Sequence, residues 1–371
     1  MDPPTTSQAQ PEQLQQAEQR VQGGRITGID MARGLAMAGM VVVHFVNFRQ
    51  DEGAALATLA ELFRGRAMPL FMLLGGIGVT FLVRRSTTPE RDLVLRAAML
   101  FGLGLFLTEH IDRLAIVLQS YGLFFVLAAI LYRLPSRVLL LLVPVITAVG
   151  AVTFQTVGNP RAQTTFDEAL SYNGLESLVF DGFYPLFPVG AFFVLGIWLG
   201  RIDLRSDRVA ATLAGVGAAV GLAVPLLGNR IISSLDLQGA IDSRSADGMF
   251  HLARLLDSTG HSAMPAWVLS AAGTSAAVLG FSLLIAPRVA AMVHPITVVG
   301  SMSLTFYVYQ AWITRLVPPT RETSIGVEWL FTIAVYVSFA VLALMWRHWF
   351  RSGPLERLLR VGSGPRKGGN A

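Results

Sequence analysis

The sequence contains no cysteine and only one lysine among its 371 residues. The absence of cysteine excludes disulfide bonds, a thiol nucleophile and thiolate metal sites. The net charge of +5 therefore comes almost wholly from arginine.

Charge as a whole is also scarce. Charged residues make up 14% of the chain, whereas hydrophobic residues make up 53%. Soluble globular domains carry about 25% charged residues, so this composition indicates a polytopic membrane protein that has the lipid bilayer as its partner. In such a protein a positive net charge reflects the enrichment of arginine and lysine in cytoplasmic loops. We therefore expect no binding to nucleic acid.

The motifs of several soluble enzyme classes are missing. The chain has no P-loop, no GxGxxG motif opening a βαβ unit, and no GxSxG or HExxH motif in a suitable context. His251, Asp257 and His261 lie near one another in the sequence, but their spacing matches no zinc signature. We therefore expect no metal site.

Apolar stretches of about 20 residues, the length that crosses a bilayer, recur along the chain. Ten such spans can be assigned, at residues 27–48, 67–84, 92–109, 111–132, 137–157, 182–200, 208–228, 262–286, 294–316 and 326–347. With the N-terminus inside, 18 arginines and lysines fall on the cytoplasmic side and 10 on the outer side. The positive-inside rule then places both termini in the cytoplasm. The predicted fold is an all-α polytopic membrane protein with about 10 transmembrane helices.

The polar segments divide the chain into three parts. Residues 1–24 are rich in proline and glutamine, and we expect them to form a disordered tail. Residues 25–350 form the predicted transmembrane domain, and residues 351–371 form a basic cytoplasmic tail. The long loops fall on the predicted outer side, at 49–66, 158–181 and 229–261. Because long loops in a compact protein are often functional, we expect part of the functional surface on that side.

The first apolar span carries three ionisable residues, Asp30, Arg33 and His44. Such residues are costly inside a membrane and usually face a protein interior, where they have a function. At about 100° per residue they fall at roughly 0°, 300° and 320° around a helix, so they share one stripe. Arg33 and His44 are about 16 Å apart along the helix axis. The span therefore places an ion pair near one membrane surface and an imidazole near the other.

Each of these groups has two interpretations. His44 is either a general base or nucleophile suited to acyl transfer, or a histidine hydrogen-bonded between helices. The i, i+3 spacing of Asp30 and Arg33 suits a local ion pair that anchors the helix. Alternatively, the planar guanidinium of Arg33 holds a phosphate group.

Four further residues are candidates for substrate binding. Arg66 precedes the glycine-rich second span and either contributes to substrate binding or extends its charge to the membrane surface. Glu109 opens a Glu-His-Ile-Asp-Arg turn, which is either an acid–base cluster or a solvated turn. His261 and Ser262 stand at the end of the long outer loop before the eighth span.

Taken in order, several stretches resemble a known group of membrane enzymes. The segment from Arg25 to His44, in which Arg33 and His44 are separated by ten residues, resembles the first helix of the transmembrane acyltransferase superfamily. That superfamily includes heparan-alpha-glucosaminide N-acetyltransferase and the bacterial acyltransferase-3 enzymes. A related bacterial membrane family of largely unknown function (YeiB-like) is similar at Gly65–Arg66, Tyr184–Pro188, His261–Ser262, Leu304–Tyr307 and Gly353–Glu356. The matches span residues 25 to about 360.

The chain also departs from these patterns. Residues 45–66 lack the loop histidine of the animal acetyltransferases, Ala263 replaces a usual glycine, and Phe306 replaces a frequent asparagine.

The resemblance implies an acyltransferase of the cell inner membrane. It would transfer an acyl group, typically acetyl, from cytoplasmic acyl-CoA to a hydroxyl or amine of a glycan or other small envelope metabolite. In this scheme Arg33 holds the donor phosphates, Asp30 orients Arg33, and His44 takes the acceptor proton or carries the acyl group. A transporter or flippase for an envelope precursor is the alternative, and the sequence leaves a homo-oligomer open.

Overall fold

The computed structural model describes residues 26–46, 54–111, 114–156, 179, 184–242, 251–316, 323–350 and 352–360. The predicted tail 1–24 and most of the predicted loop 158–181 lie outside these residues. The regular elements in the described part are all helical, which confirms the predicted fold class. They are α2 (Thr27–Phe45), α3 (Ala54–Glu61), α4 (Ala67–Arg85), α5 (Pro89–His110), α6 (Leu118–Leu131), α7 (Ser136–Thr156), α10 (Leu186–Leu199), α11 (Asp207–Ser234), α12 (Gln238–Asp242), η2 (Leu252–Leu256), α13 (Pro265–Ile285), α14 (Ala290–Ser301), α15 (Ser303–Leu316), α16 (Ile325–Trp349) and α17 (Pro354–Leu358).

Within the described residues, seven helices are long and apolar enough to cross a membrane: α2, α4, α5, α7, α11, α13 and α16. An eighth span arises if α14 and α15, which are bent by 75° with respect to each other, are counted together. The helices α6 and α10 are apolar but have only 14 residues each. The chain is thus a multi-pass membrane protein, while the count of ten and the cytoplasmic position of both termini stay predictions.

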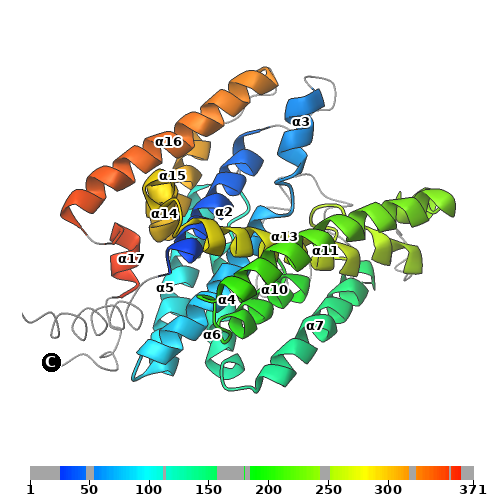
Figure 1. The fold of residues 1–371 in the computed structure, drawn as a ribbon, viewed down its shortest axis with the longest axis horizontal. Coiled ribbons are helices and arrows are strands. Elements are labelled where there is room, and N and C mark those ends of the chain that lie inside the picture. The colour runs from blue at the N-terminus through cyan, green and yellow to red at the C-terminus, as the bar shows by residue number, and fades with distance from the viewer. Residues whose placement is uncertain are drawn as a thin grey trace, which may run out of the picture.

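Helix α2 lies at the centre of the molecule, between α4 and α13 on one side and α14, α15 and α16 on the other (Figure 1). Glycine allows its neighbours to approach closely. A Cβ atom at Gly28 would lie 2.6 Å from Cα of Leu283 in α13, and one at Gly300 in α14 would lie 1.8 Å from the carbonyl oxygen of Asp30. Small residues at such crossings are typical of membrane helix pairs. The backbone that carries Asp30 is therefore fixed by close packing.

Glycines also line the crossing of α4 and α10. A Cβ atom at Gly76 would lie 2.1 Å from the carbonyl oxygen of Phe193, and one at Gly196 would lie 2.0 Å from that of Leu73. Gly76, in the glycine run of the second span, therefore serves helix packing.

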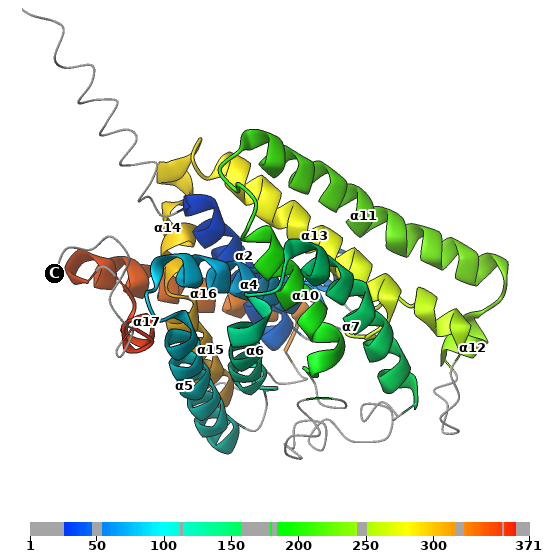
Figure 2. The same cartoon turned by 90° about the horizontal axis from the view of Figure 1, so that it is seen from below.

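Helices α11 and α13 form a long pair on one side of the molecule (Figure 2). Their contact is again lined by glycines, since a Cβ atom at Gly280 would lie 2.3 Å from the backbone nitrogen of Ala214. On the outer face of α11, Leu222, Leu226 and Leu227 are each at least 60% exposed. A large apolar exposed face of this kind is what a lipid-facing helix presents.

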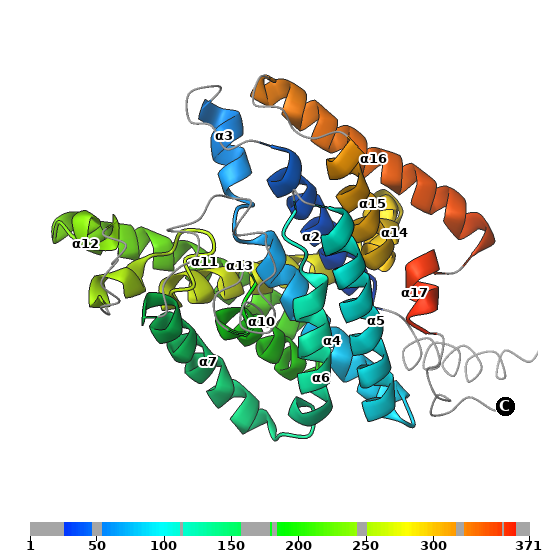
Figure 3. The same cartoon turned by 180° about the vertical axis from the view of Figure 1, so that it is seen from behind.

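The predicted span 294–316 is not one straight helix. The chain breaks at Met302, where α14 ends and α15 begins. Beyond α16, the short helix α17 folds back toward α15 (Figure 3). It lies within residues 351–371, which the sequence marks only as a basic tail. The break and α17 both border the site described next.

Candidate functional site

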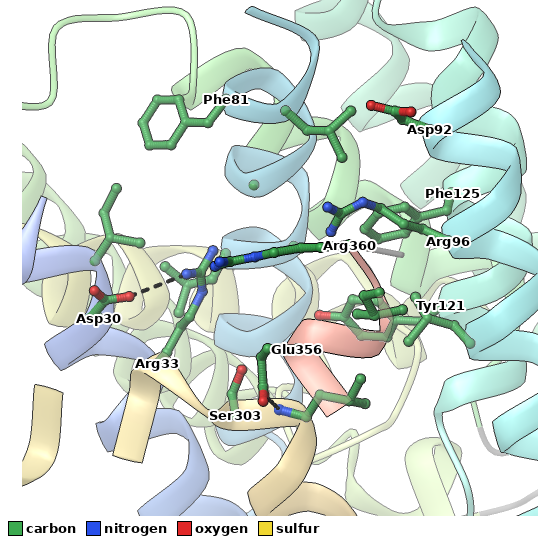
Figure 4. A pocket seen from close by; sticks show the side chains of 18 of the residues that line it. Asp30, Arg33, Phe81, Asp92, Arg96, Tyr121, Phe125, Ser303, Glu356 and Arg360 are labelled. Atoms are coloured by element: carbon green, nitrogen blue, oxygen red, sulfur yellow. Dashed lines mark hydrogen bonds and ion pairs between the residues drawn. The ribbon is translucent and has the colours of Figure 1, made fainter. Parts of the chain in front are cut away.

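A cavity of about 700 Å³ opens beside the first half of α2. Its walls come from α2, α4, α5, α6, the start of α15, and α17 with the turn that follows it (Figure 4). Asp30 and Arg33 both line this cavity. The structure therefore brings these two predicted site residues together in one concave site, which is the usual form of a small-molecule site.

The cavity wall is strongly basic. Its lining includes six arginines, Arg33, Arg84, Arg85, Arg96, Arg205 and Arg360. Figure 4 shows Arg33, Arg96 and Arg360 extending toward the same space from three different elements. Guanidinium groups converging from separate elements are suited to binding a ligand that carries several phosphate groups.

Three carboxylates also line the cavity, and each has a partner within the protein. Asp30 pairs with Arg33, Asp92 accepts a hydrogen bond of 2.8 Å from the hydroxyl of Ser86, and Glu356 accepts backbone hydrogen bonds from α15. The arginines still outnumber them, so the cavity carries a net positive charge.

The ion pair of Asp30 and Arg33 has the predicted i, i+3 geometry. Nη1 of Arg33 lies 3.4 Å from Oδ1 of Asp30, and the Asp30 side chain is only 7% exposed. Opposite them, a Cβ atom at Gly78 would lie 3.3 Å from Nη2 of Arg33. The absence of a side chain at Gly78 thus gives the guanidinium room. The local ion pair is confirmed, while a role of these residues in binding or catalysis stays a prediction.

Arg201, in the turn after α10, forms hydrogen bonds with chain segments that lie beside the cavity. Its guanidinium donates hydrogen bonds of 2.8 Å to the carbonyl oxygens of Tyr132 and Leu134. Arg84 in turn donates to the carbonyl oxygen of Arg201, at 3.2 Å. Burial lowers the pKa of Arg201. These bonds connect the ends of α4, α6 and α10 and so fix the loop that carries Arg205.

His44 lies near the opposite end of α2 and does not line the cavity. Its side chain packs toward α15, where the fully buried amide of Gln310 faces the imidazole. Within the described residues, neither Nδ1 of His44 nor either polar atom of the Gln310 side chain completes a hydrogen bond. Unpaired buried polar atoms cost free energy and are rare. Next to His44, buried polar atoms of α2 and α15 thus lack a completed hydrogen bond among the described residues.

Gln310 is the residue at this end that sequence reasoning missed. The available signal was an amide within a predicted membrane span, and nothing in the sequence connects its position with residue 44. The contact depends on the crossing of α2 and α15, which requires the tertiary structure.

The four predicted substrate-binding residues lie elsewhere. Arg66 stands just before α4, and its Nη1 atom is buried with no hydrogen-bond partner among the described residues. Glu109 is exposed near the end of α5, and Asp112 and Arg113 of the same predicted turn lie outside the described residues. Neither lines the cavity, and their roles stay predictions.

His261 and Ser262 belong to the turn before α13. The His261 ring lies 5.7 Å from the ring of Trp267 and 6.2 Å from that of Tyr184. Ser262 donates a hydrogen bond of 2.9 Å to the carbonyl oxygen of Asp257, which closes the turn. These contacts account for both side chains as parts of a packed turn, and a substrate-binding role stays a prediction. Among the residues that the structure describes, no group of three or more His, Asp or Glu side chains is placed to hold a metal ion.

Comparison with known families agrees with this picture. The family described as "Heparan-alpha-glucosaminide N-acetyltransferase, catalytic" matches residues 25–230, which include Asp30, Arg33 and His44. A second family, described as "Protein of unknown function (DUF418)", matches residues 205–364 and so includes α17. No curated protein matches the chain. The predicted resemblance to a YeiB-like and acetyltransferase-like membrane family is confirmed. Because the first match covers more than half of the sequence, the chain belongs to the heparan-alpha-glucosaminide N-acetyltransferase family.

Proposed function

We propose that this protein is an integral membrane acyltransferase that takes an acetyl group from acetyl-CoA and transfers it to a hydroxyl or amine of a glycan or small envelope metabolite. The observation that carries the proposal is the cavity of about 700 Å³ with its six arginines. The adenosine end of CoA bears a diphosphate and a 3′-phosphate, and clustered guanidinium groups are suited to this pattern of charge.

The reaction requires a base close to the thioester of a donor whose phosphate groups are bound at Arg33. Arg33 and His44 belong to the same helix and are eleven residues apart, which corresponds to about 16 Å. With its phosphates among the arginines, the donor would extend its pantetheine arm along α2, so that the thioester approaches His44. Asp30 holds Arg33 in place through the ion pair.

In the direct route the acceptor oxygen or nitrogen attacks the thioester carbonyl, and His44 takes the proton that the acceptor loses. The bond between the carbonyl carbon and sulfur breaks, and the thiolate of CoA leaves and takes up a proton. In the two-step route His44 attacks first, forms an acyl-imidazole and releases CoA, after which the acceptor displaces the imidazole. Both routes give the acylated acceptor and free CoA.

The predicted orientation supports binding of the two substrates from opposite sides of the membrane. The cavity is bordered by Arg84 and Arg85 at the end of α4 and by Arg205 in the loop before α11, and the positive-inside rule predicts that these segments face the cytoplasm. In this proposal the protein lies in the inner membrane of the cell. Acetyl-CoA enters its cavity from the cytoplasmic side. The acceptor would bind near His44 on the other side.

The test is transfer of label from acetyl-CoA, with the acetyl group radiolabelled, by the purified protein in lipid nanodiscs with an envelope extract as acceptor. We expect His44→Ala to abolish label transfer and the release of free CoA thiol. The matched control is His348→Ala, because His348 is exposed at the end of α16, where its ring lies 5.4 Å from the Trp349 ring. Equal rates for wild type and His44→Ala would overturn the assignment of His44.

One observation favours a transporter as the second candidate. The break at Met302, with its 75° bend, resembles the discontinuous helices of secondary transporters. The two functions separate in proteoliposomes: an enzyme places label on an acceptor, whereas a carrier moves the unmodified precursor across the bilayer. Movement without labelling would favour the transporter.

A further inference from the structure

In the chain that follows α16, the carboxylate of Glu356 is hydrogen-bonded to the core. Oε1 of Glu356 accepts hydrogen bonds from the backbone nitrogens of Leu304, at 2.8 Å, and Thr305, at 3.1 Å. Its Oε2 accepts a bond of 2.6 Å from the hydroxyl of Thr305. That hydroxyl in turn accepts a bond of 3.3 Å from the backbone nitrogen of Leu355. Glu356 is thus bonded to the first turn of α15 by both carboxylate oxygens.

The need for such a carboxylate follows from the break at Met302. Because α15 starts afresh at Ser303, the amides of its first turn have no partners within the helix. A carboxylate satisfies these amides and interacts favourably with the positive end of the helix dipole. Gly353 makes room for it, since a Cβ atom there would lie 2.1 Å from Oε2 of Glu356.

The same short segment supplies part of the cavity wall. Glu356, Leu359 and Arg360 all line the cavity, and Figure 4 shows Arg360 extending into it beside Arg33. A helix of five residues is not stable by itself. The place of Arg360 therefore depends on contacts that hold α17 to the core, and these contacts include the hydrogen bonds of Glu356.

We propose that Glu356 is a positioning residue of the donor site, which docks α17 on α15 so that Arg360 meets the phosphate groups of the donor. This inference rests on the proposed function, because it takes the cavity to be the site of acyl-CoA. In this arrangement Glu356 contacts no substrate and acts through Arg360. The C-terminal segment is then a structural part of the donor site.

A double-mutant cycle on CoA binding tests the proposal, with the full-length protein in nanodiscs and CoA as the probe. We expect Arg360→Gln to raise the Kd for CoA about ten- to a hundredfold, as the loss of a charge-assisted hydrogen bond does. Glu356→Gln should raise it similarly, and the double variant should bind CoA no more weakly than Arg360→Gln alone. In turnover, Glu356→Gln should raise the KM for acetyl-CoA and leave kcat unchanged. Additive effects, or a Glu356→Gln protein that binds CoA like the wild type, would overturn the proposal.

The control comes from the same helix. Arg357 lies with its guanidinium 4.9 Å from the ring centre of Phe350 and does not line the cavity, so Arg357→Gln should leave the Kd unchanged. If Glu356→Gln fails to fold, Thr305→Val removes one bond to the carboxylate, and we expect a rise in Kd of about threefold. An unchanged Kd would then overturn the proposal. A wild-type protein that does not bind CoA would overturn the proposed function itself, whereas normal binding by the Glu356 variant would overturn this inference alone.

Discussion

Replacing Gln310 by leucine is expected to stabilise the protein and to impair it as an enzyme. The Gln310 side chain is fully buried, and neither of its polar atoms completes a hydrogen bond with the residues that the structure describes. A buried polar group without a partner costs about 1–3 kcal/mol. Leucine has a similar size and no polar atom, so Gln310→Leu should raise the free energy of unfolding by an amount in that range.

The same substitution should slow acyl transfer. The amide of Gln310 faces the imidazole of His44, and leucine offers no hydrogen bond to an acceptor that binds beside that ring. Misplacing a catalytic group by about 1 Å can cost about a hundredfold in rate, so we expect a loss of about ten- to a hundredfold. A gain in stability together with a loss of rate is the known trade-off at functional sites.

The assay pairs thermal unfolding in nanodiscs with label transfer from acetyl-CoA. Gln119→Leu is the matched control, because Gln119 is 2% exposed but donates a hydrogen bond of 2.6 Å to the hydroxyl of Thr108. That variant should be destabilised by about 1 kcal/mol. A destabilised Gln310→Leu protein with a normal transfer rate would refute the reasoning, since the amide would then be a satisfied structural group.

Two further changes test the helix packing and the ion pair. Gly300→Ala should destabilise the fold by about 1–3 kcal/mol, because its Cβ atom would lie 1.8 Å from the carbonyl oxygen of Asp30 and must push α14 from α2. Gly102→Ala is the control, because no atom would lie within 4 Å of a Cβ atom at that position. In thermal unfolding it should be neutral or stabilising by up to about 1 kcal/mol. Equal changes in stability for Gly300→Ala and Gly102→Ala would contradict the packing account. Arg33→Gln should raise the KM for acetyl-CoA about ten- to a hundredfold, and an unchanged KM in steady-state kinetics would contradict its assignment to the donor.

Much of the fold could be predicted because each membrane helix is encoded locally. Runs of apolar residues mark α2, α4 and α13 within a few residues of their ends. The ion pair of Asp30 and Arg33 was also predictable, since its two members are three positions apart on one helix.

The donor cavity was harder to predict because its arginines come from distant parts of the chain. Arg96 and Arg360 are more than 260 positions apart and line the same cavity. Charge counting assigned both to the cytoplasmic side, where loop arginines usually serve topology. The break at Met302 was missed as well, since Met302 is neither proline nor glycine and the serines on either side of it are common in membrane helices. The proposed role of Glu356 depends on the new helix start that the break creates. It could therefore not be predicted from the sequence of residues 351–371 alone.

The account depends most directly on whether the arginine cavity binds the phosphate end of the donor. The decisive measurement is competition for labelled acetyl-CoA bound to the purified protein, with CoA and pantetheine as competitors. Pantetheine has the thiol arm of CoA and lacks its phosphates. The account predicts that CoA displaces the label, that pantetheine fails to do so at the same concentration, and that added salt weakens binding. Equal displacement by the two competitors, or no binding of acetyl-CoA at all, would contradict it.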